Sequence, residues 1–276
     1  MPARFLTAPT GRSPGDHGCW PFRGMGDLVR AARDYVSEGL DRHERVVFCR
    51  LSPDGIRYGD VSDAADVRWG PMPDLPVTVP LTTDPDWRPS QDPVESLGPM
   101  VDAALDDGYT GLRVLTDATD LAHDPVSRAA WVRSEHLIDR YARDHALTIL
   151  CSYDVEDLGD GPVAEVACVH ALTGGTPSPF LLHATGGGGL GLAGEVDRAS
   201  APALGRALTQ VAAAQVPTPR VLDLTELGFV DHSGLVAMHR AAAALGTRLH
   251  LVGASPLVTR LVDVLALDAL DLGEVS

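Results

Sequence analysis

The chain has 276 residues, enough for about two domains of ordinary size, so a small disulfide-stabilised scaffold is excluded. Its 22 basic and 38 acidic residues give a net charge of −16, which argues against nucleic acid or an anionic membrane surface as a partner. Lysine is absent, so the chain can have neither a phosphate-binding P-loop lysine nor a Schiff-base lysine.

The cysteines and the N-terminal residues indicate in which cellular compartment the protein works. The four cysteines, at positions 19, 49, 151 and 168, form no C-x-x-C pair. Residues 1–14 are polar and punctuated by Pro and Gly, without the apolar core of a signal peptide, and no apolar run approaches the roughly 20 residues that span a bilayer. We expect a flexible tail at 1–14 and a reduced, cytoplasmic protein.

Helix and strand patterns alternate from Asp16 onward. The apolar spacing predicts a strand at His17–Phe22, a helix from Gly26 to Leu40 and a buried strand at Val46–Cys49. Residues 52–93 are rich in Pro, Asp and Gly, so we expect a long excursion with one strand at 77–80.

The pattern becomes regular again at Ser96, which we expect to cap the next helix. The elements predicted from there are a helix at 96–105, a strand at 112–116, a helix at 125–143, a strand at 147–153 and a helical pattern at 163–170. Strands that alternate with helices predict a mainly parallel α/β sheet covered on both faces.

A composition break at LTGGTPSP, residues 172–179, predicts the boundary between two domains. We place the first domain at 15–173, a linker at 174–179 and a small α/β domain at 180–276. The second domain is predicted to have strands at 180–184, 190–196, 220–224 and 249–252 and helices beginning at Ser200, Ser233 and Ser255.

Two motifs of the second domain, GEVD at 194–197 and DHSGL at 231–235, flank one predicted helix. This order resembles the STAS domain, the fold shared by sulphate-transporter tails and anti-sigma factor antagonists. The resemblance implies phosphorylation of Ser233 and partner binding by its neighbours Asp231, His232, Gly234 and Leu235. His232 departs from the serine or threonine usual in the family, which bears on kinase recognition. The lack of a membrane segment favours the antagonist type.

The position of Ser233 also suits a switch on physical grounds. The chain passes there from the apolar Phe229-Val230 into a helical pattern, so we predict an exposed hydroxyl at a helix N-terminus, where backbone N–H groups tolerate a phosphate. The alternative is that Ser233 is only a structural N-cap.

Five segments of the first domain resemble the MEDS domain, a methanogen/methylotroph sensory module related in fold to RecA-like and KaiC-like ATPases. These are DHGCWPF at 16–22, GLDRHERVVFC at 39–49, GYTGLRVLTDATD at 108–120, WVRSEHLIDRY at 131–141 and LTILCSYD at 147–154. The family's His-x-Cys corresponds to His17 and Cys19, whose side chains share one face of a strand and can enter one small-ligand pocket at the carboxyl edge of the sheet. Arg113 and Glu135 are weaker candidates for that pocket. The alternative is an internally bonded histidine and a small buried thiol.

Other patterns are assigned to structure. A zinc site built from His17-x-Cys19 and Cys168-x-His170 is disfavoured because the second pair lies in a predicted helix, where residues two apart diverge. The G-x-G-x-x-G at 189–194 lies between strands, which predicts a hairpin and not a dinucleotide site. We therefore predict no metal, no cofactor and no catalytic residues.

The two resemblances together imply a signalling regulator that is not an enzyme. The second domain would bind an anti-sigma factor serine kinase of the histidine-kinase-like ATPase type under control of Ser233 phosphorylation, which a serine phosphatase reverses. The first domain would sense an unidentified small ligand. The alternative is a nucleotide-binding or enzymatic RecA-like domain fused to a STAS module.

Overall fold

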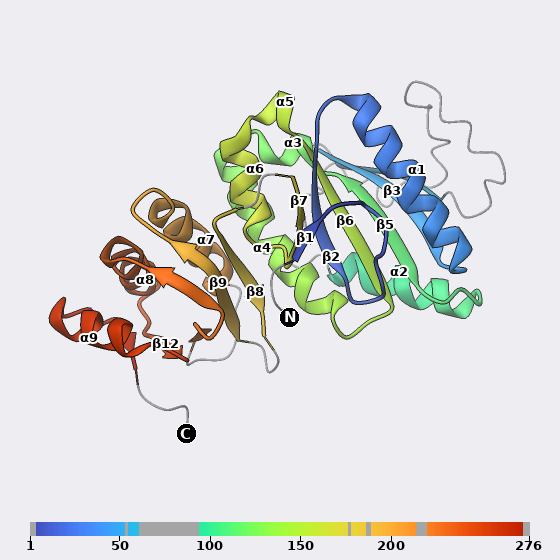
Figure 1. The fold of residues 1–276 in the computed structure, drawn as a ribbon. Coiled ribbons are helices and arrows are strands. Elements are labelled where there is room, and N and C mark those ends of the chain that lie inside the picture. Colours follow the sequence, from blue (N-terminus) through green and yellow to red (C-terminus); the bar gives the residue numbers. More distant parts are fainter. Residues whose placement is uncertain are drawn as a thin grey trace. The chain divides into compact units, whose positions relative to one another are not determined.

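The computed structural model describes residues 4–52, 55–60, 94–175, 178–185, 189–213 and 220–272. Contacts divide the chain into two compact units (Figure 1). The N-terminal unit comprises Arg4–Val166 and Leu172–Pro177, and the C-terminal unit comprises Ala167–Ala171 and Ser178–Ser276. Among the described residues, no helix combines the length and the apolar character needed to cross a bilayer.

In the described part of the N-terminal unit, seven strands form a sheet in the order β1-β7-β2-β6-β5-β3-β4, in which only the β3–β4 pair is antiparallel. Its strands are β1 (Arg4–Leu6), β2 (His17–Phe22), β3 (Arg45–Ser52), β4 (Gly55–Asp60), β5 (Leu112–Asp117), β6 (Leu147–Asp154) and β7 (Leu172–Gly174). Its helices are α1 (Met25–Asp41), α2 (Val94–Asp106), α3 (Thr119–Ala122), α4 (Pro125–Ala142), α5 (Val155–Leu158) and α6 (Asp160–Ala167). The predicted mainly parallel α/β class is confirmed.

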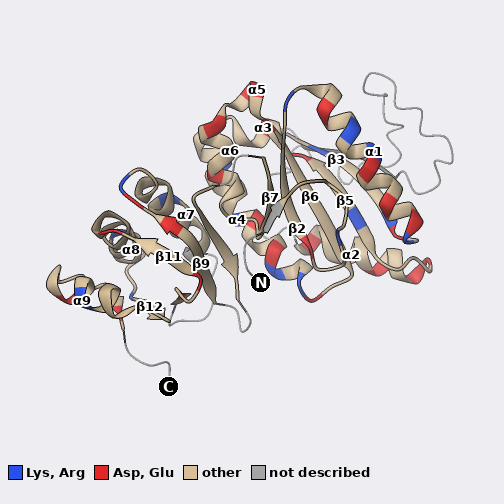
Figure 2. Cartoon of the chain, viewed as in Figure 1, with Lys and Arg blue, Asp and Glu red and all other residues tan. Residues whose placement is uncertain are grey.

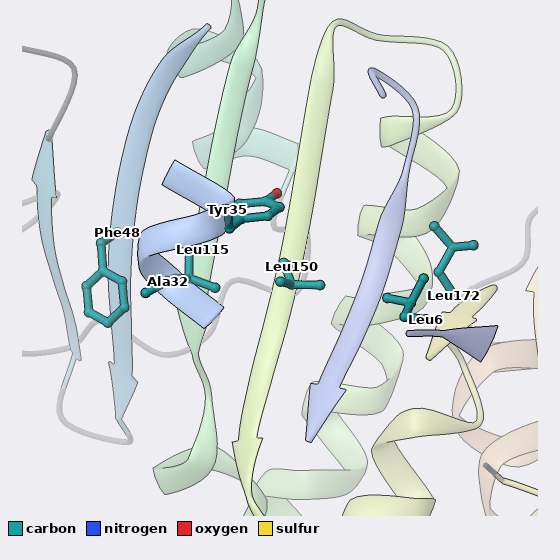
Figure 3. Packing of buried hydrophobic residues seen from close by; sticks show 7 residues of the cluster. All are labelled: Leu6, Ala32, Tyr35, Phe48, Leu115, Leu150 and Leu172. Atoms are coloured by element: carbon teal, nitrogen blue, oxygen red, sulfur yellow. The ribbon is translucent and has the colours of Figure 1, made fainter. Parts of the chain in front are cut away.

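One face of this sheet is covered by α1. Ala32 and Tyr35 of the helix pack on Leu115 of β5 and Leu150 of β6, and Figure 3 shows α1 lying across these strands. Each large apolar side chain buried in this way contributes roughly 1.5–3 kcal/mol. Because successive side chains of a strand point to opposite faces, Cys151, the neighbour of Leu150, faces away from α1.

The outer surface of α2 is acidic, whereas α1 carries acidic and basic side chains side by side (Figure 2). Exposed carboxylates on these helices belong to Asp34 and Asp41 of α1 and to Glu95, Asp102 and Asp106 of α2. The carboxylates of α2 disfavour contact with polyanions, in line with the overall charge.

The predicted flexible tail at 1–14 is wrong for part of its length. Arg4–Leu6 forms β1 and pairs in parallel with Leu172–Gly174, so the first residue of the expected linker also lies in a strand. Further along, the Gly11 amide donates to both carboxylate oxygens of Glu38, at 2.9 and 3.0 Å. Hydrogen bonds to the sheet edge and to α1 order a segment whose own sequence has no periodicity.

Three more expectations in this unit need correction. Ser96 is not a cap, because α2 begins at Val94. The excursion after Ser52 starts with β4, a strand that the sequence did not predict, whereas the strand expected at 77–80 lies outside the described residues. Cys168 and His170 follow the end of α6 at Ala167, so they are not on a helix as the argument against zinc assumed.

The C-terminal unit has a six-stranded sheet in the order β11-β9-β10-β12-β13, with β8 antiparallel to β9. Its strands are β8 (Phe180–Ala184), β9 (Leu190–Val196), β10 (Arg220–Asp223), β11 (Leu227–Val230), β12 (Leu249–Val252) and β13 (Leu270–Asp271), and its helices are α7 (Ala201–Ala213), α8 (His232–Ala244) and α9 (Pro256–Val264). The small α/β domain is confirmed, and the short strands β11 and β13 are additions to the prediction.

Most of the glycine-rich stretch at 189–194 lies within β9, where it pairs with β8 as the hairpin prediction requires. Gly194 has φ +89°, and a Cβ atom at this position would stand 2.5 Å from the Pro179 carbonyl oxygen. Glycine is therefore required there by the backbone and by a close strand contact.

Candidate functional site

The first candidate site is the amino terminus of α8. Asp231 is the N-cap, and its Oδ1 accepts hydrogen bonds from the amides of Ser233 at 2.8 Å and Gly234 at 3.0 Å. Ser233 is the second residue of the helix and not the cap, which corrects the structural alternative considered for it. Because β11 ends at Val230, the carboxylate of Asp231 is the side chain placed to reach the free amides of the first turn.

The Ser233 side chain is half-buried at the rim of this turn. Its Oγ lies 3.5 Å from Nε2 of His232, whose side chain is exposed. A phosphate on Oγ would lie beside the positive end of the α8 dipole, where negative charge is stabilised.

Gly234 and Leu235 serve the packing of α8, because both are buried. A Cβ atom on Gly234 would stand 2.7 Å from Val230 Cγ2 and 2.8 Å from Val196 Cγ1. Of the four residues expected to bind a partner, Gly234 and Leu235 are therefore placed for packing inside the domain and not for direct contact. Asp231 is half-buried, and only it, His232 and Ser233 present atoms at the surface.

The two sequence motifs meet at this helix end. The Asp231 amide donates to the Val196 carbonyl at 3.0 Å, which joins DHSGL to the end of GEVD. Beside this contact, Glu195 of β9 pairs with Phe229 of the edge strand β11, and both side chains are exposed, Phe229 by 50%. We call the exposed Glu195, Phe229 and His232, together with the half-buried Ser233, the α8 rim.

The second candidate site is a buried polar cluster between β2, β6 and α4. Nε2 of His17 lies 3.0 Å from Oε2 of Glu135, and its Nδ1 lies 3.8 Å from Oδ1 of Asp139. Glu135 and Asp139 are four residues apart on α4, so they share the helix face that covers the sheet. All three residues are at most 2% exposed.

Three further side chains complete this cluster. The Cys151 thiol donates to Oε2 of Glu135 at 3.4 Å and lies 3.6 Å from Nε2 of His17. The Tyr153 hydroxyl donates to Oε1 of Glu135 and accepts from the Trp131 indole N–H at 2.8 Å. One buried carboxylate therefore organises an imidazole, a thiol and a phenol.

The electrostatics of the cluster follow from burial and from Glu135. Burial raises the pKa of Cys151 and of Tyr153 well above their usual ranges, and the neighbouring carboxylate raises both further. Burial lowers the pKa of His17, but Asp139 and Glu135 raise it by more, to about 9. The imidazole therefore carries a proton at neutral pH and forms a buried ion pair.

The structure brings together only part of the predicted ligand pocket. Cys19 is buried beside Cys151 in the β2–β6 register, but Arg113 lies on the opposite face of the sheet. Its guanidinium stands 4.6 Å from the centroid of the Tyr35 ring and pairs with two carboxylates, Glu44 and, at 3.2 Å, Glu38. Arg113 has the same strand parity as Leu115, which faces α1, whereas His17 faces α4.

The location of the cluster also differs from the expectation. His17 is the first residue of β2, so the group lies under α4 and not at the carboxyl edge of the sheet. Cys151, Tyr153 and Asp139 were missed as members. Two signals in the sequence could have found them. Cys151 and Tyr153 occupy alternate positions of the predicted strand at 147–153, and Asp139 lies four residues after Glu135 on the predicted helix.

The chain has a mainly parallel α/β domain followed by a small α/β domain with a rim serine, and comparison with known proteins identifies these as the parts of a signalling regulator. The family model described as MEDS, MEthanogen/methylotroph, DcmR Sensory domain, matches residues 16–171, and the chain belongs to this family. A second family model, described as Mlab, STAS domain, matches residues 183–274. No curated protein matches the chain. The predicted order, MEDS and then STAS, is confirmed.

Proposed function

We propose that the chain is an anti-sigma factor antagonist whose C-terminal domain binds a serine kinase of the histidine-kinase-like ATPase type. In this proposal the kinase is also the anti-sigma factor, so its capture frees a sigma factor. The observation that carries the proposal is the division of roles at α8, where Asp231 caps the helix and leaves the Ser233 hydroxyl at the rim. A hydroxyl not required for the fold is available for modification.

In the phosphorylation step the kinase transfers the γ-phosphoryl group of ATP to Oγ of Ser233. The new O–P bond replaces the O–H bond, ADP leaves, and the hydroxyl proton is taken up by the kinase. A serine phosphatase reverses the step by hydrolysis. The chain supplies only the acceptor, so it is not itself an enzyme in this proposal.

The physical effect of phosphorylation is a local change of charge. A phosphate adds about −1.5 to −2 charges at neutral pH, next to the carboxylate of Asp231. The helix end tolerates this charge, but an apolar partner surface seated on the exposed Phe229 does not tolerate a hydrated dianion. The kinase is therefore released while the domain stays folded.

The N-terminal domain supplies the sensory input in this proposal. The MEDS match supports a sensory role, and the His17–Glu135–Cys151 cluster is the candidate element that responds to a small ligand. A ligand that changes the contacts of Glu135 also changes those of the imidazole, the thiol and the phenol that depend on it.

Two substitutions at one position test the switch. The kinase is recovered from native cells on the full chain, and phosphate incorporation is followed by intact mass and binding by calorimetry. We expect Ser233→Ala to bind the kinase without taking up phosphate, and Ser233→Asp to bind weakly. Thr259→Ala, which removes an exposed hydroxyl of α9, is the control and behaves like the wild type.

Each possible result leads to a defined conclusion. Full phosphorylation of Ser233→Ala shows that the acceptor is another residue, and unchanged binding of Ser233→Asp and of the phosphorylated wild type refutes the switch. Where the wild type binds but takes up no phosphate, His232→Ser tests the family departure at that position. Tight, magnesium-dependent ATP binding with turnover by the isolated chain supports the alternative RecA-like enzyme.

A further inference from the structure

We propose that His17, Glu135 and Cys151 form a binding site for a divalent transition metal ion, with Zn²⁺ as the ion that the donor set fits best. The inference deepens the sensory half of the proposed function and does not depend on kinase binding. It uses one imidazole, one carboxylate and one thiol from β2, α4 and β6, and it includes only His17 of the His-x-Cys pair that the sequence analysis disfavoured as part of a zinc site.

The spacing of the three donor atoms carries the proposal. His17 Nε2 and Glu135 Oε2 are 3.0 Å apart, Cys151 Sγ and Glu135 Oε2 are 3.4 Å apart, and Cys151 Sγ and His17 Nε2 are 3.6 Å apart. Ligands of tetrahedral Zn²⁺ at bond lengths of about 2.0–2.3 Å lie roughly 3.3–3.7 Å from one another. The donors therefore stand close to coordination spacing, and a shift of a few tenths of an ångström completes it. Water or another side chain supplies the fourth ligand.

The donor types select the class of metal. Thiolate and imidazole are ligands of borderline-soft transition metals, whereas Ca²⁺ and Mg²⁺ prefer oxygen ligands alone. The charge of the ligands also matches that of a divalent cation. A thiolate, a carboxylate and Zn²⁺ sum to zero, which lowers the cost of placing these groups in a buried environment.

The surrounding residues hold two of the three ligands in the orientation that metal sites use. Nδ1 of His17 faces Asp139, as in a carboxylate–histidine–zinc arrangement, and Asp139 is itself paired with Arg143 at 3.2 Å. The second oxygen of Glu135 is occupied by the Tyr153 hydroxyl, so Oε2 points to His17 and Cys151. Two of the three ligands, His17 and Glu135, thus have their orientation set by a group behind them.

Metal binding replaces protons in this cluster. The Cys151 S–H bond is exchanged for an S–Zn bond and the proton leaves, and His17 loses the proton on Nε2 as that atom binds the metal. Glu135 exchanges its hydrogen bonds to those protons for a bond to the ion. The site therefore has two states, hydrogen-bonded and metal-bound, with different contacts between α4 and the sheet.

Cobalt titration of the full chain tests the site. The protein is stripped with a chelator, kept reduced and titrated with Co²⁺, whose tetrahedral thiolate complexes show a sulfur-to-metal charge-transfer band and visible d–d bands. We expect one equivalent to bind with both signatures and Zn²⁺ to displace it. Cys151→Ser removes the charge-transfer band, whereas Cys49→Ser, which changes a buried thiol of β3 outside the cluster, leaves the spectrum unchanged.

A variant outside the ligand set keeps the test valid if Cys151→Ser does not fold. Asp139→Asn changes the group behind His17 and its ion pair with Arg143 but none of the three ligands, and we expect it to weaken Co²⁺ binding by about 10–100-fold with an unchanged circular dichroism spectrum. A wild-type chain that shows no thiolate band, or a band that persists in Cys151→Ser, overturns the proposal. Kinase binding and Ser233 phosphorylation measured on the same samples report separately on the proposed function.

Discussion

Replacing Asp231 with alanine tests whether the cap of α8 and the switch are separate residues. The carboxylate bonds two amides of the first turn, at 2.8 and 3.0 Å, and its loss leaves both without that partner. Removal of an aspartate N-cap costs about 0.5–2 kcal/mol, and because two amides are involved we expect about 1–2 kcal/mol. Ser233→Ala removes a hydroxyl that contacts His232, so we expect a change within about 0.5 kcal/mol.

Urea unfolding with two probes measures this difference. All four tryptophans and all five tyrosines precede residue 154, so fluorescence follows the N-terminal domain, whereas far-UV circular dichroism follows both domains. We expect Asp231→Ala to lower the midpoint of the dichroism transition assigned to the C-terminal domain by roughly 0.5–1 M urea and to leave the fluorescence transition in place.

Asp231→Asn is the matched control, because asparagine is also a good N-cap, and its effect should be within a few tenths of a kcal/mol. An equal loss of stability in Ser233→Ala and Asp231→Ala would refute the assignment of the cap to Asp231. So would an Asp231→Ala protein as stable as the wild type.

Gly234→Ala should destabilise the C-terminal domain by about 1–3 kcal/mol, because the new methyl group would stand 2.7 Å from Val230. Gly205→Ala in α7 is the matched control and should be neutral or stabilising, because its new methyl group meets its nearest neighbour at 3.7 Å. Urea midpoints followed by circular dichroism compare the two variants, and equal effects would exclude the steric explanation. Alkaline pH should destabilise the N-terminal domain through Cys49, because burial raises the pKa of this thiol to about 12 while the unfolded thiol ionises near its ordinary value. The stability gained from the neutral thiol is complete below about pH 9 and is lost as the pH rises toward 12, and the loss amounts to about 1.4 kcal/mol at pH 10. Unfolding followed by fluorescence at pH 8 and pH 10 should therefore show a smaller loss in Cys49→Ser than in the wild type, and parallel losses would count against a role for Cys49.

The long elements of this protein are local in origin, which is why the sequence predicts them. The period of the apolar residues predicted β2 with its observed bounds at His17–Phe22, and it placed α4 and β6 within a residue or two. The short strands β1, β4, β11 and β13 have no such signal. Each consists of a few residues made into a strand by hydrogen bonds to a neighbour distant in sequence or across a turn.

The candidate sites, like the strands and helices, were predicted from the sequence only in part. The sequence alone identified Ser233 from its motif, and it identified His17 and Glu135 as candidates. Which residue caps α8 was decided by the end of β11 at Val230, which brings the Asp231 carboxylate to the amides. The assignment of the cap therefore needed the structure.

The buried cluster was decided almost entirely by tertiary structure. His17 is 118 residues from Glu135 and 134 residues from Cys151, and no local pattern relates residues at such separations. The parallel register of β2 and β6 and the face of α4 that covers them bring the imidazole, carboxylate and thiol together. Strand parity sends Arg113 to the opposite face, against Tyr35. The sequence determined which chemical groups are present, and the packing of α4 on the sheet determined which of them meet.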